Sequence, residues 1–162
     1  MASIQSLGLN LTKLVPITSR FALPFGVYYS LLSLRVFAAR ISTRHYLGIN
    51  LPEEASNKSK PQQTLLDGSP YPSGLELAVR AHSNFNENVP LAFIFLMAAE
   101  LNGGDERVLG AVMGLLLTLR ILHVEVGLNS PGTAGWGRPV GYLGSLAVLV
   151  GLGGYAGWLG WN

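Results

Sequence analysis

The stretch that decides the fold is Arg80-Ala-His-Ser-Asn84-Phe-Asn-Glu87-Asn-Val-Pro90, and the chain after it is apolar as far as Ala99. Arg80, Asn84 and Glu87 are spaced four and three residues apart, so on a helix they lie on one stripe. A charged group at the mouth of an apolar segment is costly unless it pairs or meets a polar ligand. The stripe therefore predicts a binding site, and its mixed charge favours a zwitterionic ligand.

The composition of the whole chain indicates a membrane protein. Only 12% of the 162 residues are charged, where soluble domains average about a quarter, and 49% are hydrophobic. The net charge of +2 is too small to indicate a nucleic-acid partner. The chain has no cysteine and its three histidines lack ligand spacing, so the sequence predicts no metal site and no disulfide.

Four apolar stretches, at 17–39, 75–101, 106–128 and 138–161, are long enough to cross a bilayer of about 30 Å at about 1.5 Å per residue. The sequence thus predicts an all-α integral membrane protein, a single domain over residues 1–162 with four transmembrane helices in a left-handed type of bundle. The short turn at 102–106 makes the second and third helices antiparallel neighbours. The polar, proline-containing segment 41–74 is expected to be a flexible loop.

Basic residues predict the orientation of these helices. They concentrate in and around the loop after the first helix and at the start of the fourth, so these two loops are expected to face the cytosol and both termini the lumen. The first helix lacks the features of a cleaved signal and is expected to be a retained anchor. We expect the endoplasmic reticulum membrane; the mitochondrial outer membrane is the alternative, because no acidic residue precedes Glu53.

Other polar residues of the predicted spans lie toward the same boundary as Arg80. They are Arg35 in the first span and Arg40 directly after it, Arg120 and His123 in the third, and Arg138, Tyr142 and Ser145 in the fourth. An arginine-rich pocket that also holds one glutamate suits a small peptide with two carboxylates and one amine. Guanidinium groups bind carboxylates through two hydrogen bonds, and Glu87 is placed to accept the ammonium.

The segment Arg80-Ala-His-Ser-Asn84-Phe-Asn-Glu87, followed by Asn-Val-Pro-Leu and a helix ending Ala-Glu-Leu-Asn-Gly-Gly, resembles the MAPEG family, the membrane-associated proteins of eicosanoid and glutathione metabolism. The resemblance extends more loosely to Ser33–Arg40, to Arg120–His123, and to Arg138 with Tyr142. It implies a homotrimer of four-helix bundles that binds glutathione between neighbouring subunits near the cytosolic face.

The resemblance also implies a role for each matching residue. Arg80, Asn84 and Glu87 would hold glutathione, assisted by Arg40 or Arg35 and by Arg120 and His123, while Tyr142 and Arg138 would be catalytic. A cation near the thiol lowers its pKa and so produces the nucleophile, which is the part implied for Arg138. Three of these assignments have a simpler alternative: Arg40 as a topology signal, His123 as a hydrogen bond between helices, and Tyr142 as an interfacial aromatic.

Two positions depart from the family's prostaglandin E synthase. Pro139 follows Arg138 where that enzyme has a serine, and Ser83 stands where it has an arginine. We therefore expect no prostaglandin isomerisation. The expected function is glutathione transfer to a lipophilic electrophile, or reduction of a lipid hydroperoxide by glutathione. The alternative is a non-enzymatic lipid-binding scaffold of the same family. A transporter is only a weak third alternative, because the charged residues of the spans gather at one boundary and not at the middle of the membrane.

Overall fold

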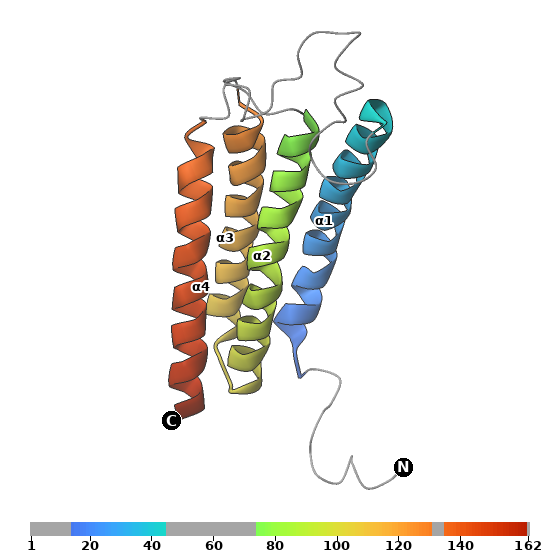
Figure 1. Cartoon of the computed structure of the whole chain (residues 1–162). Helices are drawn as coiled ribbons and strands as arrows, with labels where there is room; N and C mark the ends of the chain where they lie inside the picture. The colour runs from blue at the N-terminus through green and yellow to red at the C-terminus, as the bar shows by residue number, and fades with distance from the viewer. Residues whose placement is uncertain (1–13, 45–73, 131–134, 162) are drawn as a thin grey trace, which may run out of the picture.

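The structure, a computed structural model, describes residues 14–44, 74–130 and 135–161. Its elements, in chain order, are α1 (Pro16–Thr43), α2 (Gly74–Leu101), α3 (Glu106–Ile121), the π-helix η4 (Leu122–Leu128) and α4 (Gly137–Trp161). The helices lie roughly along one direction (Figure 1). The end of α1, the start of α2, the end of η4 and the start of α4 lie at one end of the bundle, as the alternating topology predicts.

The helix ends follow from local sequence. Pro16 occupies the first turn of α1, where its missing N–H removes no hydrogen bond, and Arg44 closes that helix in the left-handed conformation with φ of 54°. Asp105 caps α3: its side chain accepts hydrogen bonds from the backbone N–H groups of Arg107 and Val108 at 2.9 and 3.0 Å. The short turn at 102–105 therefore ends one helix and starts the next.

The four predicted helices are present, but within the described residues three elements are both long and apolar enough to cross a membrane. They are α1, α3 with its continuation to Leu128, and α4. The length of α2, 28 residues, also suffices, but the charges of Glu76, Arg80 and Glu87 lower the hydropathy of its first half. Most of the predicted loop at 41–74 lies outside the described residues.

Packing within the bundle centres on α4. This helix packs against α2 and against α3 with η4, so the hairpin partners α2 and α3 touch each other less than each touches α4. Glycines permit this approach: a Cβ atom at Gly141 would lie 2.6 Å from the Leu119 carbonyl oxygen, and one at Gly144 would lie 2.8 Å from the Leu119 side chain. Buried apolar residues such as Leu96, Leu109 and Leu116 fill the interior.

The predicted third helix changes geometry near its end. From Leu122 the backbone continues as a π-helix, and the N–H of Asn129 donates to the Val124 carbonyl five residues earlier at 2.9 Å. Short π segments within helices are rare and frequently occur at functional sites. This one contains His123, one of the residues for which the sequence predicts a ligand role.

A buried carboxylate closes the opposite end of the bundle. Glu100, near the end of α2, accepts hydrogen bonds from the backbone N–H of Ile17 at 2.5 Å and from both the N–H and the hydroxyl of Thr18 at 3.1 and 2.7 Å. It thereby caps the first turn of α1, where a negative charge is favoured by the helix dipole. The contact ties the two helices together across 83 positions in sequence.

Candidate functional site

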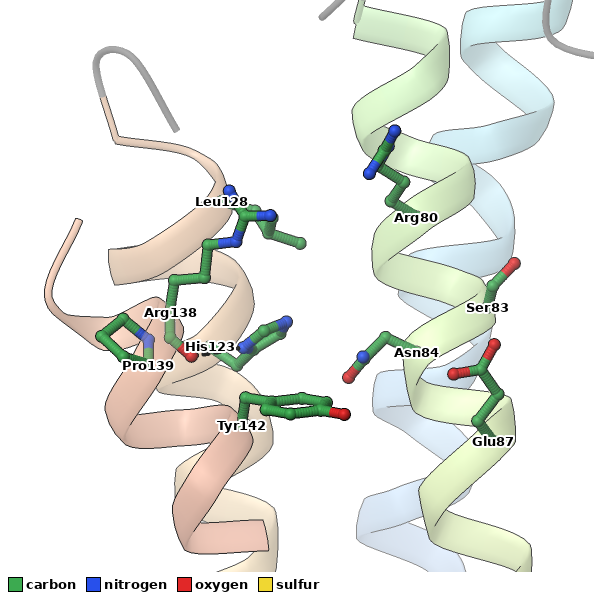
Figure 2. A pocket seen from close by; sticks show the side chains of 9 residues that line it. All are labelled: Arg80, Ser83, Asn84, Glu87, His123, Leu128, Arg138, Pro139 and Tyr142. Atoms are coloured by element: carbon green, nitrogen blue, oxygen red, sulfur yellow. Dashed lines mark hydrogen bonds between the residues drawn. The ribbon is translucent and has the colours of Figure 1, made fainter. Parts of the chain in front are cut away.

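A cleft of about 500 Å³ opens at the end of the bundle where α2 faces η4 and α4. Its α2 wall consists of Arg80, Ser83, Asn84 and Glu87, and its other wall of His123, Leu128, Arg138, Pro139 and Tyr142. Figure 2 shows Asn84 and the hydroxyl of Tyr142 directed toward each other across the space between the walls. Six of the nine residues with a predicted site role, namely Arg80, Asn84, Glu87, His123, Arg138 and Tyr142, thus line one cavity.

The charges on the α2 wall differ in how they are paired. Both Nε and Nη2 of Arg80 donate to one oxygen of Glu76, at 3.0 and 2.8 Å, one turn earlier on the same helix. Glu87 is exposed and forms no hydrogen bond or ion pair with any described residue. The spacing of Arg80 and Glu76 already suits an ion pair, and our sequence analysis missed it. Glu87 is accordingly the carboxylate on this wall that a cationic ligand group can use.

Asn84 is held from behind the cleft by Arg120. The Nη1 atom of Arg120 donates to Oδ1 of Asn84 at 2.5 Å, and Nη2 donates to the carbonyl of Gly141 at 2.6 Å. Arg120 is only 2% exposed and does not line the cleft. Since a guanidinium group can only donate, the Asn84 atom that it contacts must be the oxygen. The amide NH2 of Asn84 is left for the cleft.

His123 and Tyr142 lie in the cleft wall opposite α2. The Nδ1 atom of His123 lies 2.9 Å from the carbonyl oxygen of Arg138, which can only accept, so Nδ1 carries the proton and Nε2 remains available. The rings of His123 and Tyr142 lie 6.3 Å apart. His123 therefore forms the hydrogen bond between helices that its simpler interpretation predicts. The same residue also lines the cleft.

Three predicted ligand residues lie elsewhere. Arg120 is behind the cleft. Arg35 forms an ion pair with Glu125 at 2.6 Å, and Glu125 also accepts a hydrogen bond from Tyr28 at 3.3 Å, which joins α1 to η4. Arg40 is in the last turn of α1 and is not part of the cleft lining. A pairing such as that of Arg35 with Glu125, 90 positions apart, has no local signal in the sequence.

The sequence analysis did not predict site roles for Ser83, Leu128 and Pro139, which complete the lining. Ser83 and Pro139 are the two positions at which the sequence was found to depart from the family's prostaglandin E synthase, and both line the cleft. Leu128 lies in the lining because η4 has π-helical geometry, and that geometry has no recognisable signal in the sequence. Within the described ranges, no three His, Asp or Glu side chains are grouped closely enough to hold a metal ion.

The cleft lies at one end of a bundle whose outer surface is apolar. Large apolar side chains are exposed on several helices, for example Leu23 at 74%, Phe37 at 61% and Val150 at 76%. Such a surface is stable in lipid and not in water. The chain is an integral membrane protein, and charged and polar side chains line the cleft at one end of its bundle.

Comparison with known families identifies this architecture. The sequence model of the MAPEG family matches residues 21–158, which include the whole cleft. Neither a search of curated proteins nor a search of solved structures found a match. Since the family model covers most of the chain, the protein belongs to the MAPEG family.

Proposed function

We propose that this protein is a glutathione-dependent membrane enzyme that transfers glutathione to a lipophilic electrophile or uses it to reduce a lipid hydroperoxide. The observation that carries the proposal is the cleft. It brings together Glu87, a carboxylate that has no partner among the described residues, the amide of Asn84 and the guanidinium group of Arg138 in a chain of the MAPEG family. Members of this family generally use glutathione.

The groups in the cleft match the chemistry of glutathione, a peptide with two carboxylates, one ammonium and one thiol. Glu87 suits the ammonium, while the Asn84 amide and the Arg80 guanidinium suit carboxylate or carbonyl oxygens. The cleft volume of about 500 Å³ is within the usual range of small-molecule sites, about 300–1,000 Å³. Arg80 has one face held by Glu76, which restrains its side chain before a ligand arrives.

The chemistry that bound glutathione supplies is that of a thiolate nucleophile. Arg138 would favour that charge through its guanidinium group, which lies on the α4 side of the cleft. Tyr142, one turn along the same face of α4, would donate a hydrogen bond to the developing charge or to the oxygen of a second substrate. Asn84 and Glu87 would hold the peptide portion on the facing wall.

The second substrate is proposed to be lipophilic and to reach the cleft from the bilayer. The apolar outer surface of the helices supports this route, because a compound dissolved in lipid meets that surface first. Pro139 cannot donate a hydrogen bond from its side chain, and Ser83 adds no charge. A substrate that needs such contacts at these two positions, as in prostaglandin isomerisation, is therefore not proposed.

We further propose the assembly and the location. A homotrimer in the membrane of the endoplasmic reticulum, with α2 as the fourth crossing helix and the cleft at the cytosolic boundary, is consistent with membership of the family and with the basic residues at that end. Native mass spectrometry in detergent measures the assembly. Fractionation of cells that express the tagged full chain measures the organelle, with mitochondrial outer membrane as the competing outcome.

The function is tested by turnover in detergent with glutathione and two second substrates, an aryl halide and a lipid hydroperoxide. Calorimetry with glutathione alone accompanies the assay. Activity toward either substrate, together with binding, supports the proposal. Binding without activity toward either substrate would favour the lipid-binding scaffold, and absence of glutathione binding would overturn the proposal altogether.

A further inference from the structure

Arg120 is the most deeply buried charged side chain near the cleft, yet it does not touch the cleft. We infer that Arg120 is a positioning residue: it orients the Asn84 amide so that its NH2 group faces the ligand, and it holds the two walls of the cleft at a fixed separation. This inference rests on the proposed function for the identity of the ligand. Its geometric part rests on the contacts of Arg120 alone.

The first support is the set of hydrogen bonds that Arg120 makes. Nη1 binds the side chain of Asn84 on α2, and Nη2 binds the backbone carbonyl of Gly141 on α4. One guanidinium group therefore bridges the two helices that form opposite walls. Gly141 immediately precedes Tyr142, so the bond to its carbonyl also fixes the backbone from which the tyrosine projects.

The second support is the orientation that Arg120 imposes on the Asn84 amide. Without a partner, an asparagine amide can present either its oxygen or its NH2 group, since the two are nearly the same shape. With Oδ1 held by a donor-only guanidinium, the NH2 group is the part left for the ligand. The cleft thus selects an acceptor at Asn84, such as a carboxylate or a peptide carbonyl, and rejects an ammonium there. The ammonium is directed to Glu87, one turn further along α2.

The third support is the cost of burying Arg120. Its side chain is 2% exposed, it forms no ion pair with any described residue, and its Nε atom is buried without a hydrogen-bond partner. A buried cation in this condition is destabilising on its own. A structural role between apolar helices would be served better by an uncharged side chain. A function that needs a donor-only, positively charged group at this place accounts for the arginine.

The test uses the full chain in detergent and two substitutions, Asn84→Asp and Arg120→Gln, alone and together. Melting midpoints are measured without ligand, and glutathione affinity is measured by calorimetry. A carboxylate at position 84 gains an ion pair with Arg120, so Asn84→Asp should raise the midpoint by about 2–4 °C. In the Arg120→Gln background the same change should lower it. A change of the same sign in both backgrounds overturns the inference.

Glutathione affinity separates the two possible orientations of Asn84. If its NH2 group serves the ligand, Asn84→Asp removes the donors and adds repulsion, and binding should weaken about tenfold or more. If its oxygen served the ligand, the carboxylate would replace it and binding would persist. Unchanged or tighter glutathione binding in Asn84→Asp therefore overturns the orientation assigned to the Asn84 amide. Arg120→Gln should also weaken binding, although it leaves every residue of the cleft lining in place.

Arg107→Gln provides the matched control, because Arg107 is an exposed arginine at the other end of α3. It should change neither the midpoint nor the affinity. If Arg120→Gln does not yield folded protein, Asn84→Asp alone decides: a lower midpoint than that of the wild type overturns the inference. If wild-type protein does not bind glutathione, the proposed function fails, while the ligand-free midpoints still decide the positioning role of Arg120.

Discussion

The two ends of the helical bundle use polar side chains in opposite ways. One end, here called the turn end, carries the short turn between α2 and α3. There Glu100 caps α1, Asp105 caps α3, and the Tyr155 hydroxyl accepts a hydrogen bond from the Asp105 backbone N–H at 3.1 Å. These groups satisfy the backbone at helix ends and do not line the cleft. At the cleft end, Glu87 has no partner among the described residues. Asn84 has its side-chain oxygen held by Arg120, and its NH2 group has no hydrogen-bond partner among the described residues.

This difference separates residues that hold the fold from residues that are kept for a ligand. A carboxylate and a tyrosine occur at both ends, so these residue types alone do not distinguish them. The distinction depends on whether a polar group finds its partner within the chain. Substitutions at the turn end should therefore reduce stability and spare binding, whereas substitutions at the cleft end should reduce binding or turnover and spare stability.

The largest effect is expected from Arg138→Leu. Without the guanidinium group, the pKa of bound glutathione should rise toward its free value, and turnover near neutral pH should fall about a hundredfold. The thiolate absorbs in the ultraviolet, so a titration between about pH 5 and 10 compares the two midpoints. Binding should largely persist. Equal titration midpoints and equal turnover would remove Arg138 from the mechanism and make Tyr142 the candidate donor to sulfur.

A smaller effect on binding is expected from Glu87→Gln. The neutral side chain leaves the ligand ammonium without its charged partner, and affinity for glutathione should fall by about 1–3 kcal/mol. The control is Glu106→Gln, an exposed carboxylate at the other end of the bundle, which should leave the affinity unchanged. Calorimetry on both variants gives the comparison. Wild-type affinity in Glu87→Gln would contradict a ligand role for the stripe on α2.

At the turn end, Glu100→Gln tests the structural half of the comparison. The amide keeps one acceptor oxygen but presents an NH2 group to a backbone donor, which should cost about 1–2 kcal/mol of stability. The melting midpoint should drop by about 2–8 °C, while glutathione affinity stays at the wild-type value. Glu106→Gln, an exposed change in the neighbouring turn, is the control. A loss of affinity without a change in midpoint would show that the two ends are coupled.

The smallest effect is expected where α1 meets η4. The side chains of Arg35 and Glu125 are 45% and 33% exposed, and an ion pair of this kind contributes about 1 kcal/mol or less. Arg35→Gln should therefore lower the midpoint by only a few degrees and leave glutathione affinity of the isolated chain unchanged. A tenfold loss of affinity would return Arg35 to the ligand set that the family resemblance implies.

Much of this molecule could be predicted from sequence because it depends on local spacing. The lengths of the apolar stretches predict the helices, and the stripe Arg80, Asn84, Glu87 predicts one wall of the cleft. The rest depends on partners that are distant in the chain. The cap that Glu100 provides, the ion pair of Arg35, and the position of Arg120 behind Asn84 are each set by helix packing, which a single sequence does not encode locally. The π-helical register of η4 has no compositional signal either.

The π-helical geometry of η4 determines how the cleft tolerates insertions and deletions in this segment. A π turn holds about one residue more than an α turn, so a segment that continues an α-helix in π geometry is equivalent to a helix with an added residue. Deleting one residue between Val124 and Gly127 should let η4 revert to the α register. Because the deletion removes the added residue, every later side chain would keep its direction around the axis; the same change of geometry without a deletion would rotate each of them by about 100°. Leu128 would therefore stay in the cleft with His123 after the deletion, whereas α geometry at full length would move it out of the cleft. The match between length and geometry in this segment fixes which side chains form the wall.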